Sequence, residues 1–173
     1  MDILLLMSIQ RNKMKIFIRT TCERSLEQFK DLDYELLIDK EKIGCRGYFE
    51  QLKYLATIED DILLLEDDIK LRPSFFECLN SLIEMSNNRY IINMSHPNGI
   101  IKLFEPDKFF WTRAVYYPKG SISKFMQNYT DDYLSVSKYY DKIQQTLMTE
   151  KYIGVPSIMN VIDLDTPSLM NYK

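Results

Sequence analysis

The chain has 173 residues, of which 46% are hydrophobic and 27% are charged, and its formal net charge at pH 7 is −3. This length suits a single domain with a sizeable core, and the ordinary composition excludes gross disorder. The acidic balance argues against nucleic-acid binding as the main function, because such a surface needs clustered Lys and Arg. No stretch approaches the ~20 apolar residues that a membrane span requires.

Cysteine and histidine usage limits the compartment and the chemistry. The three cysteines are widely spaced without a CxxC pair, which fits reduced thiols in a cytoplasmic protein: Cys22, Cys45 and Cys78. The single histidine, His96, rules out a histidine-rich zinc site. It lies in a Ser-His-Pro-Asn-Gly sequence, which predicts a turn and an ordinary loop histidine.

Residues 1–13 are expected to be a leader or a disordered extension, and the folded domain is expected to span residues 14–173. The apolar run from Ile3 to Ile9 is short, and Asp2 precedes it where a signal peptide would carry basic residues. The first strand signal begins at Lys15.

The first part of the chain alternates short apolar runs with helical patterns. Strands are predicted at residues 15–18, 34–38, 62–65 and 90–94, and helices at about 22–32, at 48–58 and after Pro73. This β-α-β-α-β-α-β order predicts a parallel sheet with right-handed crossovers. The predicted fold class is therefore α/β, with a mostly parallel central sheet flanked by helices.

The pattern changes after Met94. A short strand is predicted at 100–104, an aromatic-rich strand at 109–118, a helix at 121–129, a helix from Thr130 or Asp131 through Tyr140, and a last strand at 152–155.

Ile62 to Leu65 is an apolar run that ends in three consecutive carboxylates, Glu66, Asp67 and Asp68. The run is too short for a buried helix and predicts a strand covered on both faces. In open α/β sheets, ligands bind beyond the carboxyl ends of the strands. Neighbouring carboxylates raise each other's pKa unless a cation neutralises them, and Mg²⁺ or Mn²⁺ suits their oxygens. The alternative is a solvated acidic turn after a buried strand.

The other predicted strands that end at this edge are followed by residues suited to a phosphate or a nucleotide. These candidates are Arg19, Thr20, Thr21, Arg24, Asp39 and Arg46. Arg46 stands at the start of a predicted helix, where the helix dipole does not favour a cation, so it could serve a ligand. The alternative is an ordinary set of strand-to-helix turns.

The segment Leu65-Glu66-Asp67-Asp68-Ile69 is similar to the "LEDDI" form of the DxD motif. Weaker matches to the proteins that carry this motif occur before and after it, in the same order along the chain as in those proteins. They lie at residues 19–24, 44–56, 112–119, 131–134, 155–160 and 168–169. From Lys15 to about Leu169 the chain therefore resembles small nucleotide-sugar glycosyltransferases of the GT-A fold. It looks most like the bacterial lipooligosaccharide-type transferases and their phage-borne relatives.

The resemblance implies a GT-A-like, Rossmann-like domain that transfers a sugar from a nucleotide-sugar donor, most readily a UDP-sugar, to a hydroxyl acceptor. The acceptor would be a glycan, a lipooligosaccharide or a modified phage component. It also implies an Mn²⁺ or Mg²⁺ cofactor held by Glu66 and Asp68. Alternate residues of an extended segment point the same way, so these two side chains should converge while Asp67 faces elsewhere.

The resemblance assigns the remaining site residues as follows. Thr20, Thr21 and Asp39 are expected near the base and ribose, and Arg24 or Arg46 near phosphate. Arg19 and Asp67 complete the expected donor-binding set. Asp132 is expected to be the general base for the acceptor hydroxyl, although an acid at a helix start is also simply favoured by the dipole.

Two departures from the family leave other readings open. Val161 stands where the family's closing histidine falls, so Asn160 or Asp163 would have to replace that metal ligand. The chain is also short for the fold. Both points favour the second hypothesis, a non-catalytic GT-A-like nucleotide-sugar-binding or interaction protein. A DxDxT-type phosphatase is a poor match, because Glu66 replaces its nucleophilic Asp and Lys70 its Thr.

Overall fold

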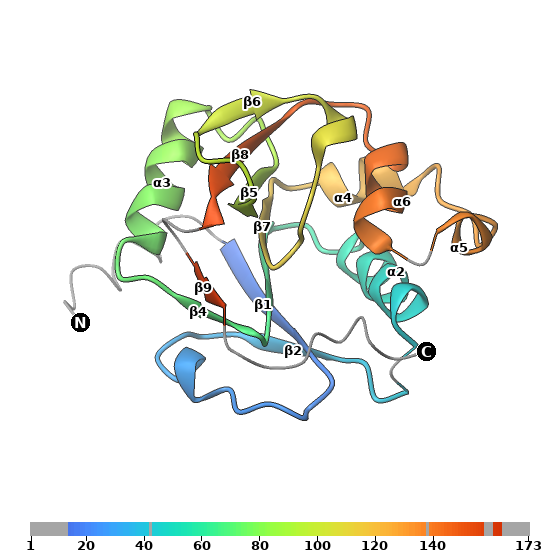
Figure 1. Cartoon of the computed structure of the whole chain (residues 1–173), viewed down its shortest axis with the longest axis horizontal. Helices are drawn as coiled ribbons and strands as arrows, with labels where there is room; N and C mark the ends of the chain where they lie inside the picture. The colour runs from blue at the N-terminus through green and yellow to red at the C-terminus, as the bar shows by residue number, and fades with distance from the viewer. Residues whose placement is uncertain (1–13, 42, 138, 158–160, 164–173) are drawn as a thin grey trace.

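A computed structural model describes residues 14–41, 43–137, 139–157 and 161–163. Figure 1 shows the central sheet running from β2 to β6, with α3 on one side and α2, α4, α5 and α6 on the other. The expected extension at residues 1–13 and the candidate Asn160 lie outside the described residues. Within these ranges, no helix has both the length and the apolar character that membrane crossing needs.

The strands are β1 (Met14–Thr20), β2 (Glu35–Ile38), β3 (Asp61–Glu66), β4 (Ile69–Leu71), β5 (Ile92–His96), β6 (Lys102–Phe104), β7 (Ala114–Tyr117), β8 (Tyr152–Pro156) and β9 (Val161–Asp163). The α-helices are α2 (Cys45–Leu55), α3 (Phe75–Met85), α4 (Ser121–Met126), α5 (Tyr133–Val136) and α6 (Tyr140–Leu147), and the 3-10 turns are η1 (Glu27–Phe29) and η2 (Pro106–Lys108).

The seven-stranded sheet has the order β2-β1-β3-β7-β5-β8-β6, and β4 pairs with β9 in a separate small sheet. The pairs β1–β2, β1–β3 and β5–β8 are parallel. The predicted mostly parallel sheet is confirmed, because five of the seven strands run in the same direction. The two exceptions are β7, which lies antiparallel between β3 and β5, and β6, which pairs antiparallel with β8. All four residues of β7 are buried, and a strand without a solvent face belongs in the interior of a sheet.

Strand β3 serves two hydrophobic cores at once, which explains its continuous apolar run. Ile62 and Leu64 pack with α2, α4 and α6 on one face of the sheet. Leu63 and Leu65 pack with α3 and η1 on the other face. Because alternate residues of a strand face opposite sides, both sets must be apolar. The predicted strand buried on both faces is confirmed.

The helix predicted at about 22–32 is wrong, and only the short η1 turn forms there. Cys22 adopts a left-handed φ of 64°, and its N–H donates to Thr20 Oγ1 over 2.8 Å. Gln28 Nε2 donates to the carbonyl oxygen of Asp67 over 3.1 Å. The local apolar spacing favours a helix, but contacts with a distant part of the chain hold this segment in another conformation.

Two further predicted elements differ in the structure. The aromatic strand predicted at 109–118 begins only at Ala114, because residues 109–113 form a loop. The helix predicted to run through Tyr140 is replaced by α5, which stops before an extended Ser137 (ψ 141°), and by α6, which begins at Tyr140.

His96 is the last residue of β5 and is fully buried, so the predicted loop histidine is wrong. Its ring stacks on Phe104, and the Asn98 N–H donates to Nδ1 over 3.2 Å. Nε2 lies 3.1 Å from the Lys108 carbonyl oxygen and 2.8 Å from the Tyr152 hydroxyl oxygen. Burial lowers the pKa of His96, and these contacts fit a neutral structural imidazole.

Candidate functional site

The ends of β1, β2 and β3 meet at one edge of the sheet, as predicted. Arg19 pairs with Glu66 in the β1–β3 register, and Thr20 pairs with Ile38 in the β1–β2 register. Strand β7 begins at the same edge, because it is antiparallel and Ala114 pairs with Leu65. This edge therefore brings the carboxylates of β3 beside the residues that follow β1 and precede β7.

Asp67 holds this edge together and is not open to a ligand. Its side chain is fully buried. Thr20 Oγ1 donates to Oδ2 over 2.5 Å, and Arg24 Nη1 lies 2.8 Å from Oδ1 in an ion pair. The Asp67 N–H also donates to the Arg19 carbonyl oxygen over 3.1 Å. Thr20, Arg24 and Asp67 were predicted to bind the donor, and the structure joins them in an internal network in which Thr20 and Arg24 each bind Asp67.

Glu66 is nearly buried and its Oε1 atom carries several contacts. The Tyr140 hydroxyl donates to Oε1 over 2.8 Å and the Thr112 hydroxyl over 3.3 Å. Arg19 Nη1 lies 3.6 Å from the same oxygen. Oε2 takes part in none of these contacts. Glu66 is therefore held in a fixed orientation by contacts from three elements that all reach Oε1.

Asp68 differs from its two neighbours. Its side chain is partly buried, and Oδ1 is buried without a hydrogen-bond partner among the described residues. Burial and the negative charge of Glu66 raise the pKa of Asp68 to about 6, against the opposing effect of Arg113 and Arg24. A buried acceptor without a donor is destabilising unless something binds it. The predicted convergence of the Glu66 and Asp68 side chains stays a prediction.

Arg19 links the acidic motif to the start of α2. Its Nε donates to Gln51 Oε1 over 3.0 Å, and Nη2 donates to the Gly44 carbonyl oxygen over 3.4 Å. The guanidinium carbon lies 5.2 Å and 5.3 Å from the ring centroids of Tyr48 and Tyr140. The two tyrosine rings are stacked on each other and lie on the same side of the guanidinium. With these contacts and its N–H groups used, Arg19 acts as a buried cation that offsets the charge of Glu66.

Asp39 closes the turn from β2 into α2. Its N–H donates to the Thr20 carbonyl oxygen over 2.9 Å, and its Oδ1 accepts the Ile43 N–H over 3.2 Å. The carboxylate lies directly against Gly47, where a Cβ atom would be only 2.6 Å from Asp39 Oδ2. Gly47 is therefore required for Asp39 to reach this position.

We expect Gly47→Ala to lower the melting temperature, because the new methyl group displaces Asp39 from the turn. Such overpacking typically costs about 1–3 kcal/mol. Gly99→Ala is the matched control, since its Cβ meets nothing within 4 Å. Differential scanning fluorimetry of both variants tests this, and equal melting temperatures would contradict the close contact.

The remaining predicted residues lie in the loop after β1 and at the starts of α2 and α5. Thr21 is buried and donates to Glu23 Oε2 over 3.4 Å, and Arg46 is exposed on the first turn of α2. Asp132 is exposed at the start of α5.

No contact among the described residues joins Asp132 to the acidic pair, and its assignment as general base stays a prediction. The adjacent Asp131 lies 3.6 Å from Lys53 on α2. Lys53 and Gln51 are about 200° apart around the helix, at about 100° per residue. Asp131 and its neighbour therefore approach the side of α2 that faces away from Arg19.

Sequence reasoning missed several residues that shape this site. Tyr140 and Thr112 bind Glu66, and Gln51 binds Arg19. Thr112 and Gln51 lay within matched segments, but no local signal marked them or Tyr140, because their roles depend on how the loop before β7, α2 and α6 pack on the sheet.

The described residues fit a divalent cation in part. Within the described ranges, no three His, Cys, Asp or Glu residues are grouped to hold a metal ion. Glu66 and Asp68 nevertheless offer two carboxylates, and the buried Oδ1 of Asp68 lacks a donor. Mg²⁺ is commonly bound by one or two carboxylates together with substrate phosphates. Asp163 pairs with Ile69 across β4 and β9, so its backbone lies beside the motif.

Comparisons with known proteins add little. No family model matches the chain, and no curated protein matches it. Among solved structures it is similar to "Crystal Structure of A197 from STIV", with a TM-score of 0.47 and 10% sequence identity, over 90% of this chain and 95% of that chain. A likeness this weak carries no argument about function.

Proposed function

We propose that this protein is a metal-dependent glycosyltransferase of the GT-A type that moves a sugar from a nucleotide-sugar donor to a hydroxyl acceptor. The observation that carries the proposal is the pair Glu66 and Asp68 at the exit of β3, with a buried Oδ1 on Asp68 that has no hydrogen-bond partner among the described residues. A solvent-exposed acid keeps its usual pKa, whereas burial and the charge of Glu66 raise the pKa of Asp68, and raised pKa values are typical of functional sites. The LEDDI-like sequence around them supports the same reading.

In this proposal Glu66 and Asp68 hold Mn²⁺ or Mg²⁺, and the bound cation neutralises the charge that develops on the leaving diphosphate. The residues of the chain hold this pair in place. Tyr140, Thr112 and Arg19 orient Glu66, and the Asp67 network joins the loops after β1 and β3. Arg46 remains a candidate for phosphate, because it is exposed at the start of α2.

Thermal shift of the whole chain tests this proposal. We expect a UDP-sugar with Mn²⁺ to raise the melting temperature, since a ligand at 100 times its dissociation constant stabilises the native state by about 2.7 kcal/mol. Mn²⁺ alone should give a smaller rise, and UDP-sugar with EDTA none. No rise with UDP-, GDP-, CMP- or TDP-sugars in Mn²⁺ would overturn the proposal.

A non-catalytic nucleotide-sugar-binding protein is the second candidate, and the position of Asp132 favours it. Asp132, the residue expected to take the acceptor proton, is exposed at the start of α5, and its neighbour Asp131 pairs with Lys53 on α2. Release of UDP from a UDP-sugar, measured over hours with and without oligosaccharide acceptors, separates the two readings. Binding without any UDP release supports the second.

A further inference from the structure

Trp111 adopts a backbone conformation that is rare for a bulky residue. Its φ is 52°, and 41% of the residue is exposed. Non-glycine residues avoid this left-handed region, at a cost of about 1–3 kcal/mol. The neighbouring aromatics behave differently, since Phe109, Tyr116 and Tyr117 are fully buried. Of the aromatic-rich run, Trp111 is thus the residue that the fold keeps at the surface.

A buried amide holds this conformation. Asn93 Nδ2 donates to the carbonyl oxygens of Phe110 and Trp111 over 2.6 and 2.7 Å. Asn93 is itself fully buried, and the Ser95 N–H and hydroxyl donate to its Oδ1 over 2.9 and 3.0 Å. Every polar atom of the amide is used to fix the loop. The buried Asn93 amide therefore fixes the backbone that holds the Trp111 indole at the surface.

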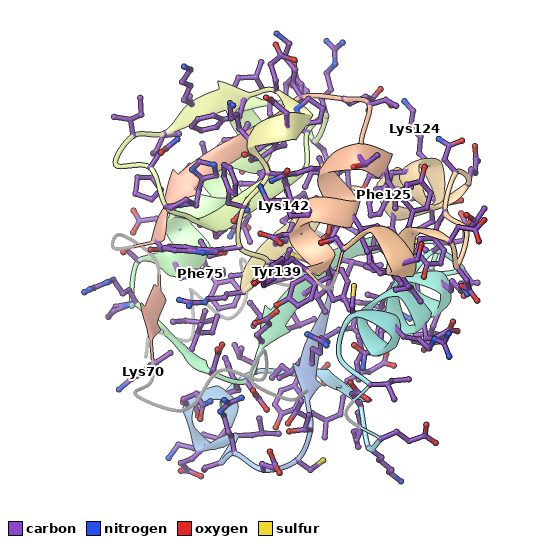
Figure 2. The ribbon with its side chains drawn as sticks, turned by 45° about the vertical axis from the view of Figure 1, so that its right-hand side comes forward. Lys70, Phe75, Lys124, Phe125, Tyr139 and Lys142 are labelled. Atoms are coloured by element: carbon purple, nitrogen blue, oxygen red, sulfur yellow. The ribbon has the colours of Figure 1, made fainter. Side chains whose placement is uncertain are left out.

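Helix α6 holds the same loop from the other side. Gln145 Nε2 donates to the Phe109 carbonyl oxygen over 2.6 Å. Lys142 Nζ lies 4.8 Å from the ring centroid of Phe110, and Figure 2 shows Lys142 on the α6 side of this loop. Rigid support from two elements is what a preorganised binding residue requires.

The loop is also tied to the acidic pair. Thr112 donates to Glu66 Oε1, and the Glu66 N–H donates to the Arg113 carbonyl oxygen over 2.8 Å. Arg113 lowers the pKa of Asp68 in opposition to burial, and its guanidinium carbon lies over the Trp111 ring, 5.1 Å from the centroid. One side of the indole is therefore covered by a cation that also acts on Asp68.

The order of the strands sets the direction of a bound donor. In the order β2-β1-β3-β7, Thr20 and Asp39 lie on one side of the acidic pair and Trp111 lies on the other, just before β7. A ligand with its nucleotide over β1 and β2 and its diphosphate at Glu66 and Asp68 places its sugar toward Trp111. A flat indole surface matches the apolar C–H face of a hexopyranose ring.

We propose that Trp111 is a carbohydrate-stacking residue that binds an uncharged hexopyranose ring beside the acidic pair, with Asn93 as its positioning residue. The direction of the ligand rests on the proposed function, whereas the stacking surface stands on its own geometry. The ring belongs either to the donor sugar or to the acceptor, and the experiment separates these sources.

Trp111 is the only tryptophan of the chain, so intrinsic fluorescence reports on it alone. The wild-type chain is titrated in Mn²⁺ with UDP, with UDP-glucose, UDP-galactose and UDP-N-acetylglucosamine, and separately with lactose and maltotriose. We expect a sugar-bearing ligand to change the emission and UDP alone to leave it unchanged. A response to a UDP-sugar identifies the donor sugar, and a response to a free oligosaccharide identifies the acceptor.

Calorimetry on Trp111→Leu should show roughly five- to tenfold weaker binding of the responding sugar, within the range of an aromatic contact, with UDP affinity unchanged. Trp111→Phe should recover most of the loss, and Tyr54→Leu, which removes an exposed aromatic of α2, should lose nothing.

The outcomes distinguish the two proposals. If UDP binds but no sugar changes the emission and Trp111→Leu binds as wild type does, the stacking proposal is overturned and the proposed function stands. If no nucleotide binds but an oligosaccharide changes the emission, the proposed function fails and the stacking residue stands. If no nucleotide binds and no oligosaccharide changes the emission, both the proposed function and the stacking proposal are overturned.

Discussion

Replacing Asp68 with Asn is expected to stabilise the metal-free protein and to remove its stabilisation by Mn²⁺. Burial and Glu66 raise the pKa of Asp68 from 3.8 to about 6, so the ionised carboxylate is disfavoured in the folded state. The shift corresponds to at most about 3 kcal/mol at 1.36 kcal/mol per pH unit, and solvent access reduces this to about 1–2 kcal/mol. For a chain of this size, that raises the melting temperature by about 5 °C.

The stability difference between the wild type and Asp68→Asn should grow as the pH rises. A carboxyl with a raised pKa favours folding below pH 3.8, and this contribution is lost as the pH rises through about 6. Wild type and Asp68→Asn should therefore differ little near the acid end of this window and most at neutral pH. Melting curves in EDTA across the window, repeated with Mn²⁺ at neutral pH, measure both effects.

Asp60→Asn is the matched control for Asp68→Asn. It removes the same charge at the opposite end of β3, where Asp60 pairs with Lys15 over 3.7 Å near the surface. We expect this control to keep the Mn²⁺ response of the wild type. If Asp68→Asn also keeps the Mn²⁺ response, Asp68 is not a metal ligand. If Asp68→Asn melts below the wild type in EDTA, the ionised carboxylate of Asp68 is not disfavoured in the folded state.

Asp67→Ala is expected to destabilise the fold far more than any substitution at Asp68. The fully buried carboxylate accepts from Thr20 and pairs with Arg24, whose side chain is only 10% exposed. Removing one partner of a buried ion pair typically costs about 3–5 kcal/mol, because the other charge loses its compensation. Urea unfolding should show a lower midpoint with an unchanged slope.

Asp67→Asn refines the same measurement. The amide keeps an acceptor for Thr20 but loses the negative charge beside Arg24, so we expect an intermediate loss of stability. If Asp67→Ala folds as stably as the wild type and loses only ligand binding, Asp67 belongs to the binding site and the internal network is secondary.

Local pattern was enough to predict several elements of the fold. The apolar run of β3 and the helical spacing of α3 depend on burial alone, and both appear where they were expected. The segment before β2 has equally good helical spacing, yet Gln28 binds the backbone of Asp67, and only η1 forms. A contact between residues so distant in the chain leaves no local trace, so this error was unavoidable.

The residues of the candidate site likewise fall into those that local sequence features indicate and those that depend on tertiary packing. Glu66 and Asp68 could be predicted, because a strand exit and an alternating pair of acids are local features. Asp132 was assigned through resemblance alone, and its role as general base stays a prediction, with its neighbour Asp131 paired with Lys53 on α2. Tyr140 and Asn93 could not be found, since each becomes important only when α6 or β5 meets the sheet.

The antiparallel insertion of β7 has a consequence for biogenesis. Strand β3 pairs with β1 as soon as both have been synthesised, but its other edge is covered only when Ala114–Tyr117 have left the ribosome. Until then an exceptionally apolar strand presents unpaired N–H and C=O groups, which favours intermolecular association. High contact order at this strand also slows refolding. Nascent or truncated chains that end before β7 should therefore depend on chaperones.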